Sequence, residues 1–326
     1  MIVLATVAAF LVSQAALAAA IEYGPAWLRD PEFAAKEERL STKPNGSNHW
    51  VAFGSSRLVE GVRPAVLAEA DRSVFNFGLI GAGPVQERLA LRRLLRSGMQ
   101  PFAVLLEYWP PYLLDFADSR EEDRLDQERL DRRDLPDIEP YVRDPAGLAS
   151  QFHMARLVPA FSHRFVFLNL ALAVWLPFEK RQEFRWRPLD EWGWLPGKVM
   201  DPSPAARVER LRLSQQYYQP FLSSSKFDPI GERAFDDLLA DCRAAGIAVV
   251  VIWLPESSEF RSWYSPSVER MAQERFAGYG TRPGIRLINA RAWISDERLG
   301  DGFHLDPAGA TEFTRRLAAE LDRGPQ

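Results

Sequence analysis

Residues 247–254 read IAVVVIWL, an apolar run without a polar residue that ends before Pro255 and Glu256. A run of this kind is typical of a strand in a parallel sheet whose two faces are both covered. The segment before it carries apolar residues at helical spacing, and Gly246 marks its end. Because a helix leading into a buried strand is the repeating unit of α/β proteins, the stretch predicts an α/β fold. The apolar residues of that helix are Phe235, Leu238, Leu239 and Cys242.

Four more strands are expected from short apolar runs that end at glycine or at polar residues. A helix is expected from Pro84 to Gly98, and the last helix opens with Asp306 and Pro307, a cap and first-turn pair. Roughly 140 residues separate the third strand from the fourth, far more than one crossover helix needs. The sequence therefore predicts a five-stranded sheet with a long, mostly helical insertion at about 110–227. The other strands are expected at 49–53, 73–77, 102–106 and 285–288.

The composition is that of a globular protein with a full core. The chain has 326 residues, 47% of them hydrophobic and 26% charged, which excludes a disordered chain. Its only cysteine, Cys242, excludes an intrachain disulfide and a cysteine metal site. Four scattered histidines argue against zinc, so we expect no cofactor. The acidic sequence pI of about 5.8 argues against a nucleic-acid partner.

The N-terminal residues 2–21 contain no charge, and about 20 apolar residues suffice to span a bilayer. Three interpretations remain: a retained membrane anchor, a signal peptide cleaved after Ala16-Leu17-Ala18, or a buried alanine-rich helix. The first two place the rest of the chain outside the cytoplasm, either anchored to the membrane or secreted. We expect an anchor or signal at 1–21, a stalk at 22–47 and a single domain at 48–322.

The insertion contains two further features. Residues 165–176 are apolar except for Asn169, and they are too short to span a bilayer, so they predict a buried helix. Trp186, Trp192 and Trp194 could stack on sugar rings or face a membrane, but such aromatics more often pack inside the protein.

Three short motifs follow strands or precede the last helix, where an open α/β sheet binds ligands. Gly54-Ser55-Ser56-Arg57 follows the first strand directly. The second motif, NFGLIG at residues 76–81, lies at the end of the second strand. Asp301-Gly302-Phe303-His304 comes just before the last helix. Since the carboxyl ends of parallel strands meet at one edge, we expect the three motifs to meet there.

Together these motifs predict a hydrolytic site. A serine hydroxyl is a weak nucleophile and needs a base within hydrogen-bond reach, which His304 supplies for Ser56. Asp301 lies three residues before His304, so one tight turn brings its carboxylate to the imidazole and fixes the tautomer. The backbone N–H groups of Ser56 and Gly78 are candidates for stabilising an oxyanion, with Asn76 beside them.

The order of these motifs resembles the SGNH/GDSL hydrolase superfamily, and most of all its envelope-anchored bacterial branch of GSSR-type and polysaccharide O-acetylation proteins. In this resemblance Ser56 takes the nucleophile position and Ser55 replaces an aspartate. It covers about residues 48–107 and 228–322. The matched residues of the other two blocks are Asn76, Gly78 and Gly81, and Asp301 and His304.

The resemblance implies a flavodoxin-like three-layer sandwich with strand order 2-1-3-4-5. It further implies a metal-free serine esterase or acyltransferase that acts on an O-acylated polysaccharide, peptidoglycan or lipid of the cell envelope. A membrane-bound acyl donor protein is an implied partner, and the N-terminal helix implies a membrane.

The chain departs from this family after the third strand, where a GxND block is expected. Here the sequence reads Leu106-Glu107-Tyr108-Trp109, without the asparagine that lines the family's oxyanion hole. An ionised Glu107 would repel an oxyanion, so it must be protonated by burial, pair with Arg57, or bind substrate. Tyr108 is a candidate to donate the missing hydrogen bond. Loss of one oxyanion donor typically slows catalysis about 10²–10³-fold.

Glu256 follows the fourth strand and is therefore expected at the same sheet edge as Ser56. It is a candidate for contact with substrate or pairing with arginine, while Ser257 or Ser258 is a candidate helix cap. His163, in the insertion, is interpreted as a structural histidine rather than a ligand.

The leading hypothesis is a membrane-anchored serine hydrolase or acyltransferase. The alternative is a non-catalytic binding or scaffold protein on the same fold, in polysaccharide modification or export, which the missing asparagine favours. A nucleotide-binding flavodoxin-like protein is disfavoured, because neither GxGxxG nor a P-loop motif follows a strand.

Overall fold

The computed structural model describes residues 1–43, 49–68, 73–115, 121–197, 200–201, 203–223 and 226–323. The chain divides into two compact units. Unit 1 comprises residues 1–38 and 125–188, and unit 2 comprises residues 39–124 and 189–326. The long stretch between the third and fourth strands is thus divided between the two units.

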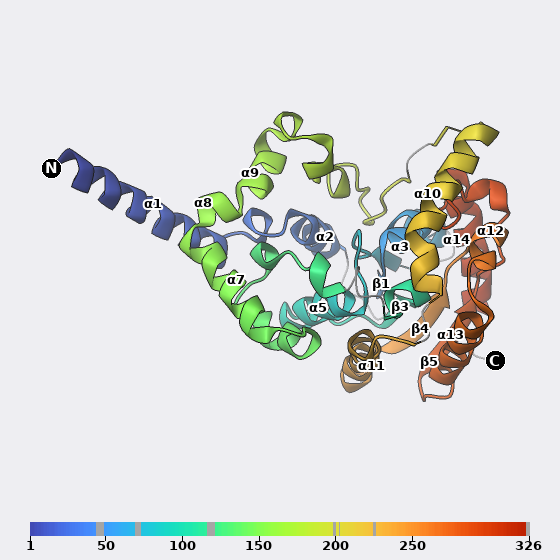
Figure 1. Ribbon diagram of the computed structural model, residues 1–326. Helices are drawn as coiled ribbons and strands as arrows, with labels where there is room; N and C mark the ends of the chain where they lie inside the picture. The colour runs from blue at the N-terminus through green and yellow to red at the C-terminus, as the bar shows by residue number, and fades with distance from the viewer. Residues whose placement is uncertain are drawn as a thin grey trace. The chain divides into compact units, whose positions relative to one another are not determined.

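Unit 2 is built on a five-stranded parallel sheet with the order β2-β1-β3-β4-β5 (Figure 1). The predicted α/β fold, the number of strands and their order are confirmed. Each strand begins within one residue of its expected start, because the apolar runs mark the buried part of each strand. The strands are β1 His49–Phe53, β2 Ser73–Asn76, β3 Ala103–Glu107, β4 Ala248–Trp253 and β5 Ile285–Asn289.

Helices cover both faces of this sheet, as the unbroken apolar sequence of β4 predicts. Alternate residues of β4 point to opposite faces: Val250 and Ile252 belong to a core cluster with Phe313 of α14, whereas Trp253 packs on Tyr108 and Phe276. Helices α3 and α4 contact α14, and α5 contacts α11. The helices of unit 2 are α3 Ser56–Gly61, α4 Pro64–Ala68, α5 Pro84–Arg96, α10 Pro204–Leu222, α11 Pro229–Ala244, α12 Ser258–Ser262, α13 Pro266–Tyr279 and α14 Pro307–Asp322.

Unit 1 is helical and begins with the apolar helix α1, Ile2–Tyr23. By length and composition this helix can cross a membrane, with a mean hydropathy of 2.2. Only Gln14 and Ile21 are buried, so the structure contradicts the interpretation as a buried core helix. The other α-helices of this unit are α2 Pro31–Ser41, whose last three residues fall in unit 2, α6 Leu135–Ile138, α7 Pro145–Leu157, α8 Pro159–Ser162 and α9 Arg164–Ala171.

The prediction of a buried helix over 165–176 is confirmed only in part: a helix is present, but it is shorter and only one side of it is buried. Helix α9 ends at Ala171, and a short 3₁₀ turn follows at Ala173–Trp175. The buried positions form a single stripe along the segment, because the rest of unit 1 covers only one side of it. The remaining residues are exposed or half-buried. The buried residues are Val166, Asn169, Ala173 and Leu176.

The tryptophans behave as expected for packing residues. Trp186 and Trp194 are buried, and Trp192 is half-buried. The indole N–H of Trp194 donates to the carbonyl oxygen of Glu60, which satisfies the ring's polar atom inside unit 2.

Candidate active site

The structure brings Ser56, His304 and Asp301 into one hydrogen-bonded chain within unit 2. Ser56 is the first residue of α3, directly after β1, and its Oγ lies 2.8 Å from Nε2 of His304. Nδ1 of His304 lies 2.7 Å from Oδ2 of Asp301. These distances are those of formed hydrogen bonds and match the arrangement of nucleophile, base and orienting carboxylate. Ser56 is half-buried, so the residue is not closed off from solvent.

The turn that carries Asp301 and His304 is fixed by its own backbone. Oδ1 of Asp301 accepts hydrogen bonds from the backbone N–H groups of Phe303 and His304, while Oδ2 faces the imidazole. Gly302 has a φ of +98°, a conformation that favours glycine because it has no Cβ. The spacing of three residues therefore brings the carboxylate to the imidazole within one turn. From outside the turn, the Ser257 N–H donates to the Gly302 carbonyl oxygen and Arg57 donates to that of Phe303.

Asp301 and His304 each stabilise the charged form of the other. Burial alone would lower the pKa of His304, but the charge and hydrogen bond of Asp301 outweigh it, so the pKa lies above 6.5. Burial alone would raise the pKa of Asp301, but the nearby imidazole and three hydrogen bonds hold it below 3.8. Asp301 is therefore ionised at neutral pH and stabilises the imidazolium that forms when His304 takes a proton.

Ser55 and Asn76 hold the nucleophile's helix in place. The Ser55 hydroxyl accepts from the Arg57 N–H and caps α3, a structural role for the residue that replaces an aspartate. The Asn76 amide donates to the carbonyls of Leu58, Val59 and Val62 at the other end of α3. Asn76 is fully buried and therefore acts on the position of α3 rather than on a ligand.

The two backbone amides proposed as oxyanion donors differ in the structure. The Gly78 N–H donates to Oδ1 of Asn76 over 3.1 Å. For the Ser56 N–H, the described part of the chain shows no hydrogen-bond partner. The Ser56 amide is thus the better placed of the two to stabilise negative charge on a bound group.

Arg57 links the strand ends beneath the site. Its side chain is 2% exposed and donates hydrogen bonds to three carbonyl groups, those of Leu254, Pro255 and Phe303. It also forms ion pairs with Glu107, over 3.3 Å, and with Glu256, over 3.8 Å. One guanidinium therefore joins the ends of β1, β3 and β4 to the loop that carries His304.

Glu107 is buried and pairs with Arg57, one of the three outcomes expected for it. Its Oε2 accepts the Ser55 N–H over 2.7 Å, so the carboxylate supports the turn that leads into Ser56. Burial raises its pKa, while Arg57 and the Ser55 N–H oppose the shift. Because the carboxylate oxygens of Glu107 face Arg57 and Ser55, Glu107 supports the site and does not face a bound substrate.

Glu256 is likewise an arginine partner. It is fully buried, and its Oε2 lies 2.9 Å from Nε of Arg291, while Oε1 accepts from Trp253 and Tyr264. The neighbouring Ser257 accepts from Phe260 N–H and caps α12, so both alternatives considered for this segment occur together.

The structure does not bring Tyr108 to the site. Its side chain is fully buried, and its hydroxyl donates to the carbonyl oxygen of Ala272 in α13. The cause is the alternation of side chains along extended backbone, which directs Glu107 and Tyr108 to opposite faces of the sheet. Tyr108 therefore replaces no missing oxyanion donor.

Sequence reasoning missed the aromatic residues beside the triad. The ring of Phe303 lies 4.3 Å from the His304 ring and stacks on Trp109 at 5.7 Å. The Arg57 guanidinium lies 4.7 Å above the Trp109 ring. Phe303, the aromatic residue between Asp301 and His304, is the sequence signal that could have indicated these aromatic contacts.

Gly54 has no room for a side chain, which gives a test of the packing around Ser56. A Cβ at this position would lie 2.7 Å from both Oε2 of Glu107 and the Cβ of Leu58. We expect Gly54→Ala to destabilise unit 2 by about 1–3 kcal/mol, as overpacked cores do. Gly278→Ala is the control, because a Cβ there meets nothing within 4 Å. Hydrogen exchange of the β1 amides measures the difference, and equal protection in both variants would contradict the prediction.

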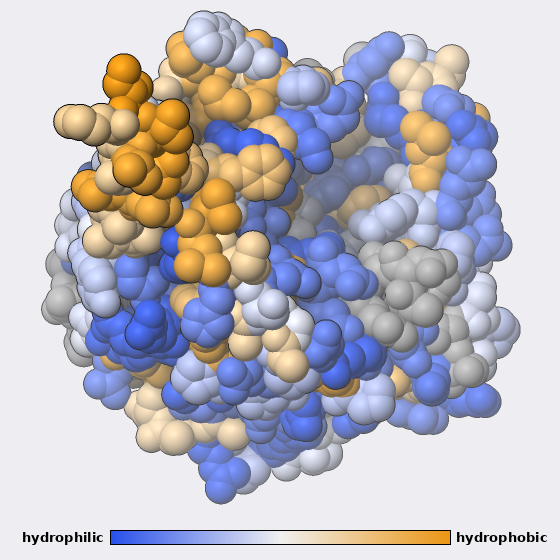
Figure 2. Space-filling view, turned by 60° about the vertical axis from the view of Figure 1, so that its left-hand side comes forward, coloured by the Kyte–Doolittle hydropathy of each residue, from blue (hydrophilic) through white to orange (hydrophobic). Residues whose placement is uncertain are grey.

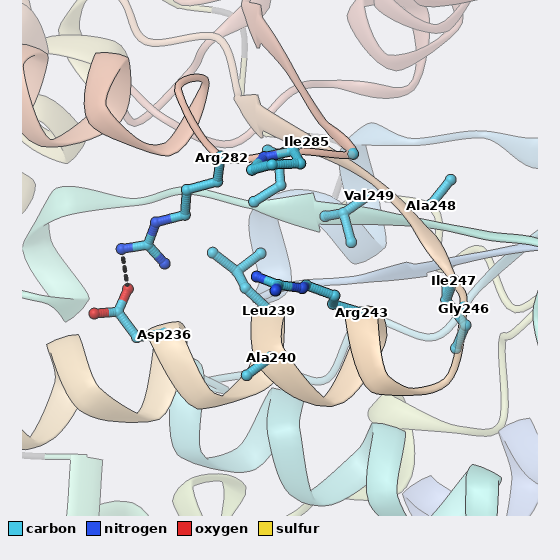
Figure 3. Close-up of a pocket in the computed structure, with 12 residues that line it drawn as sticks. Asp236, Leu239, Ala240, Arg243, Gly246, Ile247, Ala248, Val249, Arg282 and Ile285 are labelled. Atoms are coloured by element: carbon cyan, nitrogen blue, oxygen red, sulfur yellow. Dashed lines mark ion pairs between the residues drawn. The ribbon is translucent and has the colours of Figure 1, made fainter.

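A separate open cavity of about 330 Å³ lies at the opposite edge of the sheet (Figure 3). It is lined by residues at the amino ends of β4 and β5 and at the end of α11, including the ion pair between Asp236 and Arg282. The triad lies at the carboxyl ends of the strands, so this cavity does not belong to the candidate active site.

Comparison of the sequence with models of known protein families and with curated proteins finds no match. The fold and the site together define an α/β protein with a Ser-His-Asp arrangement at the carboxyl edge of its sheet.

Proposed function

We propose that this protein is a serine O-acyl esterase or acyltransferase whose nucleophile is Ser56. The observation that carries the proposal is the chain of two hydrogen bonds, 2.8 Å from Ser56 Oγ to His304 Nε2 and 2.7 Å from His304 Nδ1 to Asp301 Oδ2. The resemblance to SGNH/GDSL hydrolases supports it, since the sheet has the strand order which that resemblance implies.

In the proposed reaction Ser56 Oγ bonds to the carbonyl carbon of an ester while His304 Nε2 takes the hydroxyl proton. The Ser56 N–H stabilises the oxyanion. The tetrahedral intermediate then releases the alcohol, which receives the proton from His304. Water or a sugar hydroxyl next attacks the acyl carbon of the acyl-serine while His304 takes its proton. The bond from the acyl carbon to Ser56 Oγ then breaks, the acid or the new ester leaves, and His304 returns the proton to Ser56 Oγ.

The proposed substrate is an O-acylated glycan or lipid of the cell envelope, reached from a membrane-anchored position. The apolar helix α1 supports the location, because it is long enough to cross a bilayer and largely uncovered by the protein. Its packing on α7 and α8 favours a retained anchor over a cleaved signal.

Fluorophosphonate labelling of the purified chain tests the nucleophile. We expect stoichiometric labelling of the wild type and none of Ser56→Ala, because only an activated serine reacts readily with this electrophile. Ser262→Ala is the matched control, since Ser262 is exposed at the end of α12 and bonds only to a backbone carbonyl. Labelling that persists in Ser56→Ala would overturn the mechanism.

The same experiment addresses the non-catalytic alternative. The observation that favours it is the engaged Gly78 amide, which leaves fewer donors for an oxyanion. Absence of labelling in a folded wild type, combined with measurable binding of an acetylated glycan, would favour a binding protein.

A further inference from the structure

In residues 165–176 the polar and apolar sides are the reverse of those of a helix on the surface of a soluble protein: the polar residue is buried and large apolar residues are exposed. Asn169, the one polar residue of 165–176, lies on the buried stripe, where it donates to the carbonyls of Phe165 and Lys180 and accepts from Gln182. Large apolar side chains occupy the exposed side instead. A monomeric soluble protein rarely exposes such a set together, and a group of this kind marks an interaction surface.

This surface, which we call the apolar patch, consists of large hydrophobic side chains from the end of α7 to the turn after Trp175. Phe161 is 64% exposed, and Trp175 and Phe178 are each 72% exposed. Consecutive contacts between α7, α8, α9 and the following turn join these residues along the segment. The patch comprises Leu157, Phe161, Leu172, Val174, Trp175 and Phe178.

The patch adjoins the apolar helix α1 within the same unit. Helix α1 contacts α7 and α8, and Oε1 of Gln14 accepts the backbone N–H of Ala160, next to Phe161. Hydrophobic side chains gather around this protruding helix (Figure 2). The patch therefore continues the surface of the one helix in the described chain that can cross a bilayer.

The length of α1 before Gln14 determines how deeply this unit approaches a bilayer. Residues before Gln14 are all exposed, and about 12 helical residues extend roughly 18 Å. A bilayer's hydrocarbon core is about 30 Å thick, so the residues before Gln14 span only part of it, and full crossing needs the whole of α1. Either α1 enters deeper and carries the corner between α7 and α8 with it, or it crosses partway. When the residues before Gln14 are inserted, the hydrogen bond from Ala160 to Gln14 brings Phe161 to the bilayer surface.

The charges around the patch suit an anionic bilayer. Residues 145–181 contain four basic side chains, Arg156, Arg164, Lys180 and Arg181, and one acidic side chain, Glu179. This local charge of +3, or +2 once Glu22 is counted as the ion-pair partner of Arg156, contrasts with −4 for the whole chain. The Arg164 guanidinium lies 3.9 Å above the Phe161 ring, which places a cation beside an exposed aromatic. Aromatic and basic residues together are typical of the boundary between lipid headgroups and acyl chains.

We propose that unit 1 inserts its apolar patch into the surface of an anionic lipid bilayer, as a second membrane contact beside α1. The patch then fixes the height and orientation of unit 1 on the membrane, which a single helix does not do. This inference stands apart from the proposed reaction, because it requires no activity of Ser56.

Spin labels on the full chain test the proposal, and the sequence makes them specific. Cys242 is the only cysteine; it is buried, and burial raises its thiol pKa to about 12, so it stays unlabelled. Nitroxides are placed at Phe161→Cys, Trp175→Cys and Phe178→Cys in vesicles of phosphatidylglycerol and phosphatidylcholine. Glu139→Cys is the matched control, because Glu139 is exposed in the same unit outside the patch.

We expect the three patch labels to be several-fold more accessible to oxygen, relative to a water-soluble nickel chelate, than the label at position 139. Equal, aqueous accessibility at all four positions in vesicle-bound protein would overturn the proposal and leave α1 as the only anchor. Labels shielded from both reagents would also overturn it, because that pattern indicates a second copy of the chain over the patch.

A charge reversal tests the lipid class. Lys180 is exposed, so Lys180→Glu places a negative charge at the patch with little effect on packing. We expect it to move the label at position 178 toward water on vesicles that contain phosphatidylglycerol, with no change on phosphatidylcholine alone. An identical shift on both lipids, or none on either, would contradict recognition of anionic headgroups.

Discussion

His304→Ala is expected to lower the turnover number for ester hydrolysis by about 10⁶-fold, while the folded structure is retained. The loss is this large because the nucleophile and its base act as one unit, and removal of either costs nearly as much as removal of both. The Ser56 hydroxyl has only the Nε2 of His304 as a base within hydrogen-bond distance in the described structure. Hydrolysis of a small chromogenic acetate ester measures the effect.

The control for this variant is His153→Ala. His153 is exposed on α7 and belongs to unit 1, so its removal should leave the hydrolysis rate unchanged. A His304→Ala variant that retains a tenth or more of the wild-type rate would contradict the role of His304 as the general base.

The variant Asp301→Asn tests two effects of Asp301 on His304, the orientation of the imidazole and its pKa. We expect a loss of about 10⁴-fold, as when an orienting carboxylate is replaced by an amide elsewhere. The pH profile gives a second readout. In the wild type the neutral imidazole is the active form, so activity should rise with pH through an ionisation above 6.5. Without the charge of Asp301, burial is the largest remaining influence on the pKa of the imidazole, so this ionisation should move to lower pH.

Arg57→Met is expected to destabilise unit 2 by about 3–5 kcal/mol, since breaking a buried ion pair leaves an uncompensated charge. Arg57 forms ion pairs with Glu107 and Glu256, and all three residues are at most 3% exposed. Its hydrogen bonds to three carbonyls would be lost as well. Native-state hydrogen exchange of the β3 and β4 amides measures the change in the free energy of unfolding.

The pH dependence of this destabilisation follows from the carboxylates. Burial already raises the pKa of Glu107, and loss of Arg57 removes the group that opposes the shift most. Its protonation in the folded state would relieve the charge, so the destabilisation should shrink as the pH falls. Arg212→Ala is the control, because Arg212 pairs with Glu209 at the surface and its loss should not be measurable.

Much of unit 2 could be predicted from the sequence because its signals are local. An apolar run such as 247–254 is typical of a strand in a sheet covered on both faces, and the packing of Val250 and Trp253 on opposite sides confirms this. The spacing of Asp301 and His304 likewise specified a tight turn, since both residues lie in one turn of the chain.

The insertion was harder to predict because burial is not a property of a short segment. The apolar residues of 165–176 fit a core helix equally well, and only the extent of unit 1 decides that one stripe is covered. The same holds for Tyr108, whose hydroxyl bonds to Ala272, far along the chain.

By itself the sequence determined the sheet, the site's serine, histidine and aspartate, and the uncharged helix at the N-terminus, because each depends on residues close together in the chain. Tertiary structure alone decided that a single arginine, Arg57, pairs with both Glu107 and Glu256, that the Tyr108 hydroxyl bonds to Ala272, and that the apolar patch lies exposed beside α1. These outcomes depend on which distant segments pack together. Burial and electrostatic pairing between such segments have no signature in local sequence.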